Sequence, residues 1–148
     1  MNTYNMNQYY QTQVSTASPE QILIMLYDGA IRFTRQAIIG VEEGKPEMRR
    51  HGISKSLAII SEFARTLDHK IGSHFAEDLD ALYNFMINEL TEANIGNDVE
   101  KLKVVETLLV DLRGTWAEAI ELNKKQMATA VAVSQAPNVQ HGSFSVSR

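Results

Sequence analysis

The 148-residue chain is 44% hydrophobic and carries 14 Lys and Arg against 18 Asp and Glu, a formal net charge of −4. This length allows one domain with a substantial core, and the lack of a basic stripe argues against nucleic acid binding as the main role. No cysteine is present, which excludes disulfides and thiolate metal sites. The polar N-terminus lacks a secretory signal, and no apolar run approaches the ~20 residues of a membrane-spanning helix. We therefore expect a cytoplasmic protein without membrane insertion.

Residues 1–16 are expected to form an N-terminal docking segment. This stretch is rich in Asn, Gln and Thr and lacks helical periodicity, yet three of its residues are tyrosines. A purely disordered tail seldom holds so much aromatic surface. We interpret the segment as lying on the following domain through Tyr9, Tyr10 and Val14, from which a ligand can displace it.

A first helix is expected to begin after Ser18. Ser18 can act as the N-cap, Pro19 fits the first helical position, and Gln21 can complete a capping box. Six apolar residues then follow in a row, so they point all the way round the helix. One face of such a helix fills its own core, and the other is expected to meet a partner through Ile22 and Met25.

Two further helices follow breaks at Gly44 and Gly72. The second is expected to run from about Pro46 to His69, and the third to end at Ile95-Gly96. In both, the apolar residues alternate spacings of three and four, as on one face of a helix. The two stripes are Ile53, Leu57, Ile60, Ala64, Leu67 and Ile71, and Ala76, Leu79, Tyr83, Met86, Leu90 and Ala93.

Asn97 and Glu100 are expected to form a capping box for a fourth helix. Its apolar stripe is Leu102, Val105, Leu109, Leu112, Trp116 and Ala119. Short connections place consecutive helices antiparallel, so the expected fold class is all-α, an antiparallel four-helix bundle over residues 17–123 with an extended or short-helical N-terminal segment. Residues 124–148 are expected to prolong the fourth helix and then, from Pro137, to form a disordered C-terminal tail.

The sequence offers no constellation for catalysis or for a cofactor. None of the four histidines has a glutamate three residues before it, as a buried di-iron bundle site requires. His69 and His74 flank Gly72 near acidic residues, so a surface metal site is conceivable there, but a polar loop is the favoured interpretation. No Gly-rich phosphate loop or nucleophile–histidine pattern is present. We expect no enzyme, no cofactor and no metal.

The third and fourth helices hold more apolar residues than a core face needs. Aromatic residues and methionine suit a groove for an amphipathic partner helix, although the stripe of the third helix also permits Tyr83 and Met86 to lie in the core. A homodimer contact is the competing interpretation of the surplus. Gly29 and Gly114, each costing ~1 kcal/mol of helix propensity, mark either close approaches or tolerated positions. The surplus clusters are Leu82, Tyr83, Phe85, Met86 and Ile87 on the third helix, and Val104, Val105, Leu108, Leu109, Val110 and Leu112 on the fourth.

Several stretches together resemble the FliS family of bacterial flagellar export chaperones. The run TASPEQILIMLYDGA, residues 16–30, is similar to the opening helix of that family, and Tyr9-Tyr10 to its N-terminal tyrosine segment. The resemblance covers roughly residues 4–122. Phe85 stands where the family more often has tyrosine, and Gly114-Thr115 where it often has a better helix former. Further matching stretches are Leu82 to Met86, Ala93 to Asp98, and Leu112, Arg113 and Trp116.

The resemblance implies a partner that the residues alone do not identify. FliS chaperones hold the disordered C-terminal segment of flagellin in the cytoplasm, as helices along hydrophobic grooves, prevent its premature polymerisation and deliver it to the flagellar type III export apparatus. It also implies that the tyrosine segment covers a groove until flagellin displaces it. A homodimeric structural or adaptor bundle is the alternative function. The expected partner-binding residues are Tyr9, Tyr10, Val14, Ile22, Met25, Tyr83, Phe85, Met86, Ile87, Asn94, Val104 and Leu108.

Overall fold

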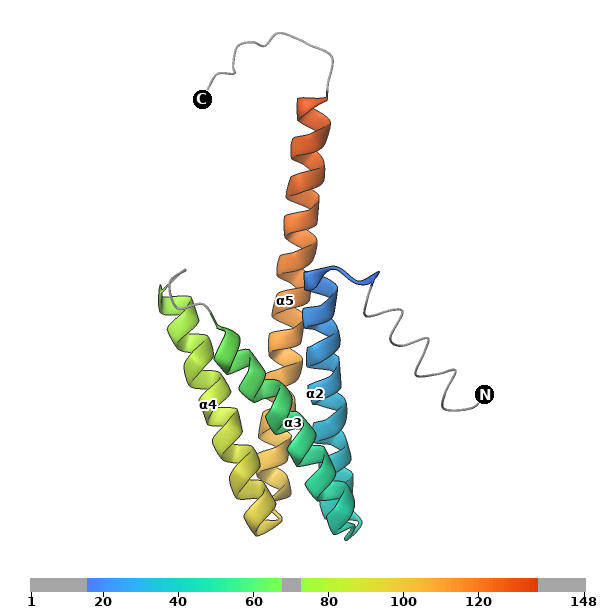
Figure 1. Ribbon diagram of the computed structural model, residues 1–148, viewed down its shortest axis with the longest axis vertical. Coiled ribbons are helices and arrows are strands. Elements are labelled where there is room, and N and C mark those ends of the chain that lie inside the picture. The colour runs from blue at the N-terminus through green and yellow to red at the C-terminus, as the bar shows by residue number, and fades with distance from the viewer. Residues whose placement is uncertain (1–15, 68–72, 136–148) are drawn as a thin grey trace, which may run out of the picture. The chain divides into compact units, whose positions relative to one another are not determined.

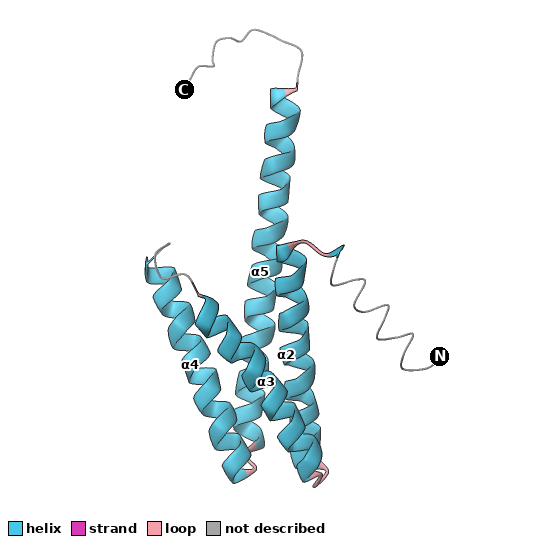
Figure 2. Ribbon diagram, in the orientation of Figure 1, coloured by secondary structure: helices cyan, strands magenta, loops and turns pink. Residues whose placement is uncertain are grey.

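The computed structural model describes residues 16–67 and 73–135, and these fold into helices without a strand (Figures 1 and 2). The helices are α2 (Pro19–Glu42), α3 (Pro46–Thr66), α4 (Ser73–Gly96) and α5 (Val99–Ser134). The chain divides into two compact units, Met1–Gly114 and Thr115–Arg148. Within the first unit, consecutive helices run in opposite directions (Figure 1). The expected all-α, four-helix fold is confirmed, whereas α3 ends before the expected His69.

The capping signals at the start of α2 form as expected. The Gln21 backbone N–H donates to Ser18 Oγ at 3.2 Å, and the Ser18 backbone N–H donates to Gln21 Oε1 at 3.0 Å. Pro19 occupies the first turn, where its missing N–H leaves no bond unmade. At the other end, Gly44 adopts a φ of +67°, a left-handed conformation that glycine adopts without steric cost. The α2–α3 connection is therefore specified locally by its sequence.

The closest approach of α2 and α3 is made by glycines. A Cβ on Gly40 would lie 2.4 Å from the Arg49 backbone nitrogen, and one on Gly52 would lie 2.5 Å from the Phe33 carbonyl oxygen. By contrast, a Cβ on Gly29 would lie at ordinary van der Waals distance, 3.5 Å, from Ile59 Cδ1, and one on Gly114 would meet nothing within 4 Å. The close-approach interpretation is therefore wrong for Gly29 and Gly114.

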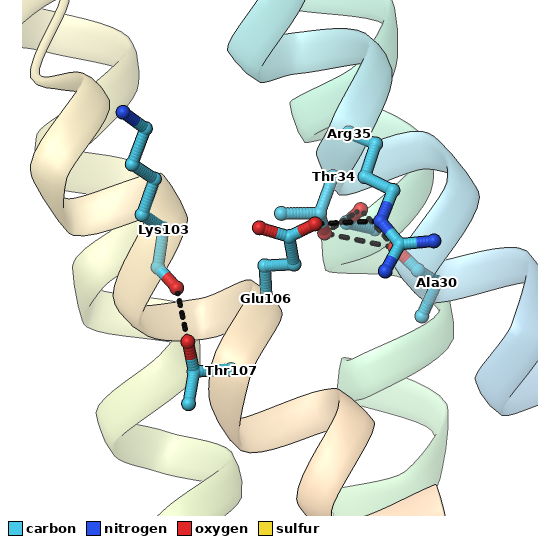
Figure 3. A network of polar contacts seen from close by, with 7 residues as sticks. Ala30, Thr34, Arg35, Lys103, Glu106 and Thr107 are labelled. Atoms are coloured by element: carbon cyan, nitrogen blue, oxygen red, sulfur yellow. Dashed lines mark hydrogen bonds and ion pairs between the residues drawn. The ribbon is translucent and has the colours of Figure 1, made fainter.

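Two buried hydroxyls join α2 to α3 beside this crossing. Thr34 Oγ1 donates to the Ala30 carbonyl oxygen at 2.8 Å and lies 2.8 Å from Ser56 Oγ. Ser56 Oγ lies 3.2 Å from the same Ala30 carbonyl oxygen, so its single proton can be donated there or to Thr34 Oγ1. Figure 3 shows Thr34 and Ala30 together on α2. Because every buried hydroxyl here has a partner, the polar contact fixes the α2–α3 register without an unsatisfied group.

Aromatic side chains from three helices meet in the core. Tyr27 of α2 stacks on Phe63 of α3 with ring centroids 4.5 Å apart, and Phe63 lies 5.6 Å from Tyr83 of α4. The Tyr27 and Tyr83 hydroxyls form a buried hydrogen bond of 2.8 Å. Burial, followed by the bond with Tyr27, raises the pKa of Tyr83 well above its ordinary value. These contacts tie α2, α3 and α4 into one core.

The expected core stripe of α4 is buried throughout, and α5 contributes Leu102, Val105 and Leu109. The start of α5 differs from expectation. Asp98 Oδ1, not Asn97, accepts from the Glu100 and Lys101 backbone N–H groups, at 3.1 and 3.4 Å. Asn97 has a φ of +52°, outside the extended region that N-cap residues occupy, so the Asn97–Glu100 capping box is wrong.

The described part of the second unit is the C-terminal portion of α5, residues 115–134. Its helix continues through the stretch expected to prolong the fourth helix. Several large apolar side chains on it are exposed: Leu122, Met127, Val131 and Val133. Of the described helices, none has the length and apolar character to cross a membrane.

Candidate partner-binding surface

The α4–α5 seam begins with a charged contact next to the connecting turn. Lys101 Nζ of α5 lies 3.0 Å from Glu92 Oε1 and 3.5 Å from Glu89 Oε2 of α4. The hydrogen bond to Glu92 and then the charge of Glu89 raise the pKa of Lys101, so its ammonium group remains charged at neutral pH. This contact identifies which flank of each helix faces the other.

Apolar side chains continue the same two flanks away from the turn. On α4, Phe85 lies four residues before Glu89, and Leu82 lies three residues before Phe85. On α5, Val104 and Leu108 follow Lys101 at helical spacing. Because the helices are antiparallel, these side chains follow the flanks of α4 and α5 that the Lys101 ion pairs identify. We call these four residues the α4–α5 apolar strip.

The α4–α5 apolar strip remains partly open to solvent. Phe85 is 44% exposed and Val104 42% exposed, whereas Leu82 and Leu108 are half-buried. Single exposed apolar residues are common, but a contiguous set with a charged rim has the composition of a binding surface. The three predicted residues Phe85, Val104 and Leu108 are thus exposed or half-buried on these two flanks. Leu82 belongs to the surplus apolar residues of the third helix but not to the expected partner-binding residues, and its spacing from Phe85 places it on the same flank.

Two predicted residues of α4 lie on its other flank, toward α3. Arg49 Nε of α3 donates to Asn94 Oδ1 at 3.1 Å, and Arg49 also bonds Asn97 through Nη1. Ile87, two helical turns before Asn94, shares this flank and is half-buried. Asn94 therefore holds α3 against the end of α4 and does not belong to the α4–α5 apolar strip.

The structure corrects the expectation for Tyr83 and Met86. Tyr83 is 3% exposed and Met86 fully buried, because both lie on the core stripe of α4. Neither side chain is available to a partner on this surface. Ile22 and Met25 lie half-buried in the first turns of α2, which is not one of the two helices that carry the strip. Tyr9, Tyr10 and Val14 lie outside the described residues.

A second feature, missed from the sequence, is a ladder of ion pairs between α2 and α5. Asp28 pairs with Arg113, with Nε and Oδ1 2.8 Å apart, and Arg35 pairs with Glu106, with Nε and Oε2 2.5 Å apart. As the α2 residue number rises by seven, its α5 partner falls by seven, as antiparallel helices require. The seven-residue spacing of charges on α2 was the signal that could have revealed it.

Among the described residues, no group of three or more His, Asp and Glu side chains could hold a metal ion. The stretch around His69 lies outside them. What the described residues do present is a helical bundle with an exposed apolar seam bordered by charges. This arrangement is typical of proteins that bind other chains by packing, and it lacks the features of a metal centre within the described residues.

Comparison with known proteins identifies the family. The family model for the flagellar protein FliS matches residues 1–123. The chain is 34% identical over 117 residues to the flagellar secretion chaperone FliS of Bacillus subtilis, covering 79% of this chain and 86% of that protein. It is 33% identical over 109 residues to the Salmonella typhimurium protein of the same name, covering 73% and 81%. The chain belongs to the FliS family, which is a family of flagellar chaperones and not of enzymes.

A solved structure described as a flagellar chaperone from bacteria shares the fold. It superposes with a TM-score of 0.65 at 18% identity, covering 79% of this chain and 98% of that one. The four-helix architecture is therefore that of a known flagellar chaperone. The expected membership in this family is confirmed.

Proposed function

We propose that this chain is a cytoplasmic export chaperone for flagellin. It binds the disordered C-terminal region of flagellin, prevents premature polymerisation and assists delivery to the flagellar type III secretion system. Membership in a family of flagellar secretion chaperones supports the export role. The observation that carries the binding proposal is the α4–α5 apolar strip, where Phe85 and Val104 each keep more than two-fifths of their surface exposed.

The mechanism is non-covalent covering of apolar surface. An amphipathic helix of the client lays its apolar face along the α4–α5 apolar strip and excludes water, at ~25 cal/mol per Å² of apolar surface buried. Lys101, held by Glu89 and Glu92 at one end of the strip, supplies a charged rim that orients the client. Ordering a disordered client opposes binding, so the affinity per unit area is modest and release at the export apparatus is feasible.

A charge placed on the strip tests this proposal. Val104→Asp is expected to weaken binding of a flagellin C-terminal peptide at least tenfold, because the client would have to desolvate the new carboxylate. Ile39→Asp is the matched control, since Ile39 is also β-branched and 42% exposed but lies on α2. Isothermal titration calorimetry on both folded variants measures the difference. Equal affinities for the two variants would remove the strip from the client site.

Solution mass separates the chaperone from a homodimeric adaptor. The proposal expects a monomer that becomes a 1:1 complex with the flagellin peptide, as measured by light scattering. An obligate dimer whose mass does not respond to peptide would mean that the strip is covered by a second copy. In that outcome Val104→Asp would dissociate the dimer, whereas Ile39→Asp would not.

A further inference from the structure

A small cavity lies between α2 and α5, on the flank of α5 that faces away from the α4–α5 apolar strip. Its volume is about 440 Å³, within the range of ligand sites. The two sites are on different flanks because Glu106 and Arg113 contact α2, whereas Lys101 contacts α4. We call this cavity the arginine pocket. It is lined by Asp28, Ile31, Arg32, Arg35, Val110 and Arg113.

Ion pairs hold two of the three arginines in place. Arg113 donates to the Asp28 carboxylate from two nitrogens, from Nε to Oδ1 at 2.8 Å and from Nη2 to Oδ2 at 3.5 Å. Arg35 donates from Nε to Glu106, which reaches from α5 toward α2 (Figure 3). The pocket walls are thereby positioned before any ligand arrives. Such preorganisation reduces the conformational entropy that binding would cost.

The pocket contains more donor capacity than the described residues use. Arg32 has no carboxylate partner in residues 16–67 or 73–135, and its guanidinium carbon lies over the Phe33 ring, 5.0 Å from the ring centroid. Arg35 bonds Glu106 through Nε, and within the same ranges its two terminal nitrogens have no partner. The arginine pocket has three guanidinium groups, and two of them pair with the carboxylates of Asp28 and Glu106. One positive charge is therefore uncompensated there, in a chain whose net charge is −4.

We propose that the arginine pocket binds a glutamate or aspartate carboxylate of an acidic peptide segment of a partner protein. Guanidinium groups are planar forks that match a carboxylate with two parallel hydrogen bonds, and Arg32 and the end of Arg35 can both donate. Between the arginines lie two aliphatic side chains, Ile31, which is 7% exposed, and Val110, which is 41% exposed. An aliphatic residue next to the acidic residue of the peptide can pack against Ile31 and Val110. A free inorganic anion would leave Ile31 and Val110 uncovered, so a peptide is the favoured ligand.

The experiment uses the full chain and three probes in NMR titrations. The probes are the capped peptide acetyl-Ala-Leu-Glu-Glu-Leu-Ala-amide, its Gln-for-Glu counterpart, and inorganic phosphate. We expect the Glu peptide to shift amide signals of α2 and α5 around the pocket and to bind at least tenfold more tightly than the Gln peptide. Binding should weaken as salt is raised, because the ligand contact is ionic and partly exposed.

Two variants and one control locate the binding. Arg32→Gln removes an exposed charge that takes part in no ion pair in the described part of the chain, and it should weaken Glu-peptide binding about tenfold. Val110→Asp places a carboxylate inside the pocket and should abolish binding by occupying the arginines. Lys55→Gln, on exposed α3 surface, removes the same charge elsewhere and should leave the affinity unchanged.

Each contrary result overturns the proposal. Absence of Glu-peptide binding, equal binding of the Gln peptide, or equal losses in Arg32→Gln and Lys55→Gln would show that the pocket does not select a peptide carboxylate. Phosphate binding as tightly as the Glu peptide would make the pocket a small-anion site. The measurement needs no flagellin, so its outcome is independent of the client proposal.

Discussion

Gly52 is one of two positions in the α2–α3 crossing where a single added methyl group should lower stability. In Gly52→Ala, the new Cβ would lie 2.5 Å from the Phe33 carbonyl oxygen, 2.7 Å from the Ala37 nitrogen and 3.0 Å from the Ala37 Cβ. None of these atoms can rotate away, so α2 and α3 must separate. Overpacking of this kind costs about 1–3 kcal/mol. Separation would also stretch the buried Thr34–Ser56 contact, and a lost partner there costs about 1–3 kcal/mol.

The higher helix propensity of alanine partly offsets this loss of stability. It also provides a control substitution at a glycine that has no close neighbour. Alanine gains ~1 kcal/mol over glycine in a helix interior, so we expect Gly52→Ala to lose about 2 kcal/mol net. Gly114→Ala makes the same chemical change where nothing lies within 4 Å of the new Cβ, and it should gain up to ~1 kcal/mol.

Urea unfolding followed by circular dichroism measures both changes. With a slope of about 2 kcal/mol/M, Gly52→Ala should lower the midpoint by about 1 M, and Gly114→Ala should raise it slightly. If Gly52→Ala unfolded at or above the wild-type midpoint, the close approach of the helices would not limit stability and the packing argument would be refuted.

Two further predictions concern the core and the N-terminal segment. Because the pKa of Tyr83 is raised, the folded state keeps a proton that the unfolded chain releases above about pH 10. The contribution of Tyr83 to stability should therefore not vary with pH below about pH 10 and should fall as pH rises beyond it. Tyr83→Phe should flatten the fall of the urea midpoint between pH 8 and 11, and an unchanged slope would contradict the assignment. Deleting residues 1–16 should weaken binding of the flagellin peptide if Tyr9 and Tyr10 contact the client, whereas tighter binding in calorimetry would make the segment a lid alone.

The parts of the fold that could be predicted from sequence are those set by neighbours in the chain. Ser18, Pro19 and Gln21 specify the start of α2 because all three act within one turn. The alternating spacing on α4 correctly gave its buried face, from Ala76 to Ala93, because helical geometry alone places those side chains together.

The errors arose where a distant residue decides between two local solutions. Asn97 and Asp98 are both good N-cap residues, and Arg49 of α3 bonds the Asn97 side chain, leaving Asp98 to cap α5. Likewise, Gly40 and Gly52 differ from Gly114 only through the helix packed against them. The sequence of one helix does not show which residues of another helix will pack against it.

Individual residues of the candidate site could be expected from the sequence, but the surface on which they lie could not. Phe85, Val104 and Leu108 were expected from surplus apolar character, yet only the Lys101 contact shows which flanks of α4 and α5 meet. The same surplus argument included Tyr83, although a residue in the buried register of an amphipathic helix belongs to the core. Apolar content thus indicates candidate residues for a partner surface, and the pairing of helices determines which of them share a flank.

The most direct test of the central claim is an NMR measurement of contacts in the complex with a flagellin C-terminal peptide. Methyl-labelled chaperone and uniformly labelled peptide allow intermolecular nuclear Overhauser effects to be assigned to single methyl groups. We predict contacts from the peptide to the Val104 and Leu108 methyls and none to Ile39, which is as exposed as Val104 but lies on α2. Contacts to Ile39 without any to Val104 or Leu108 would contradict the account.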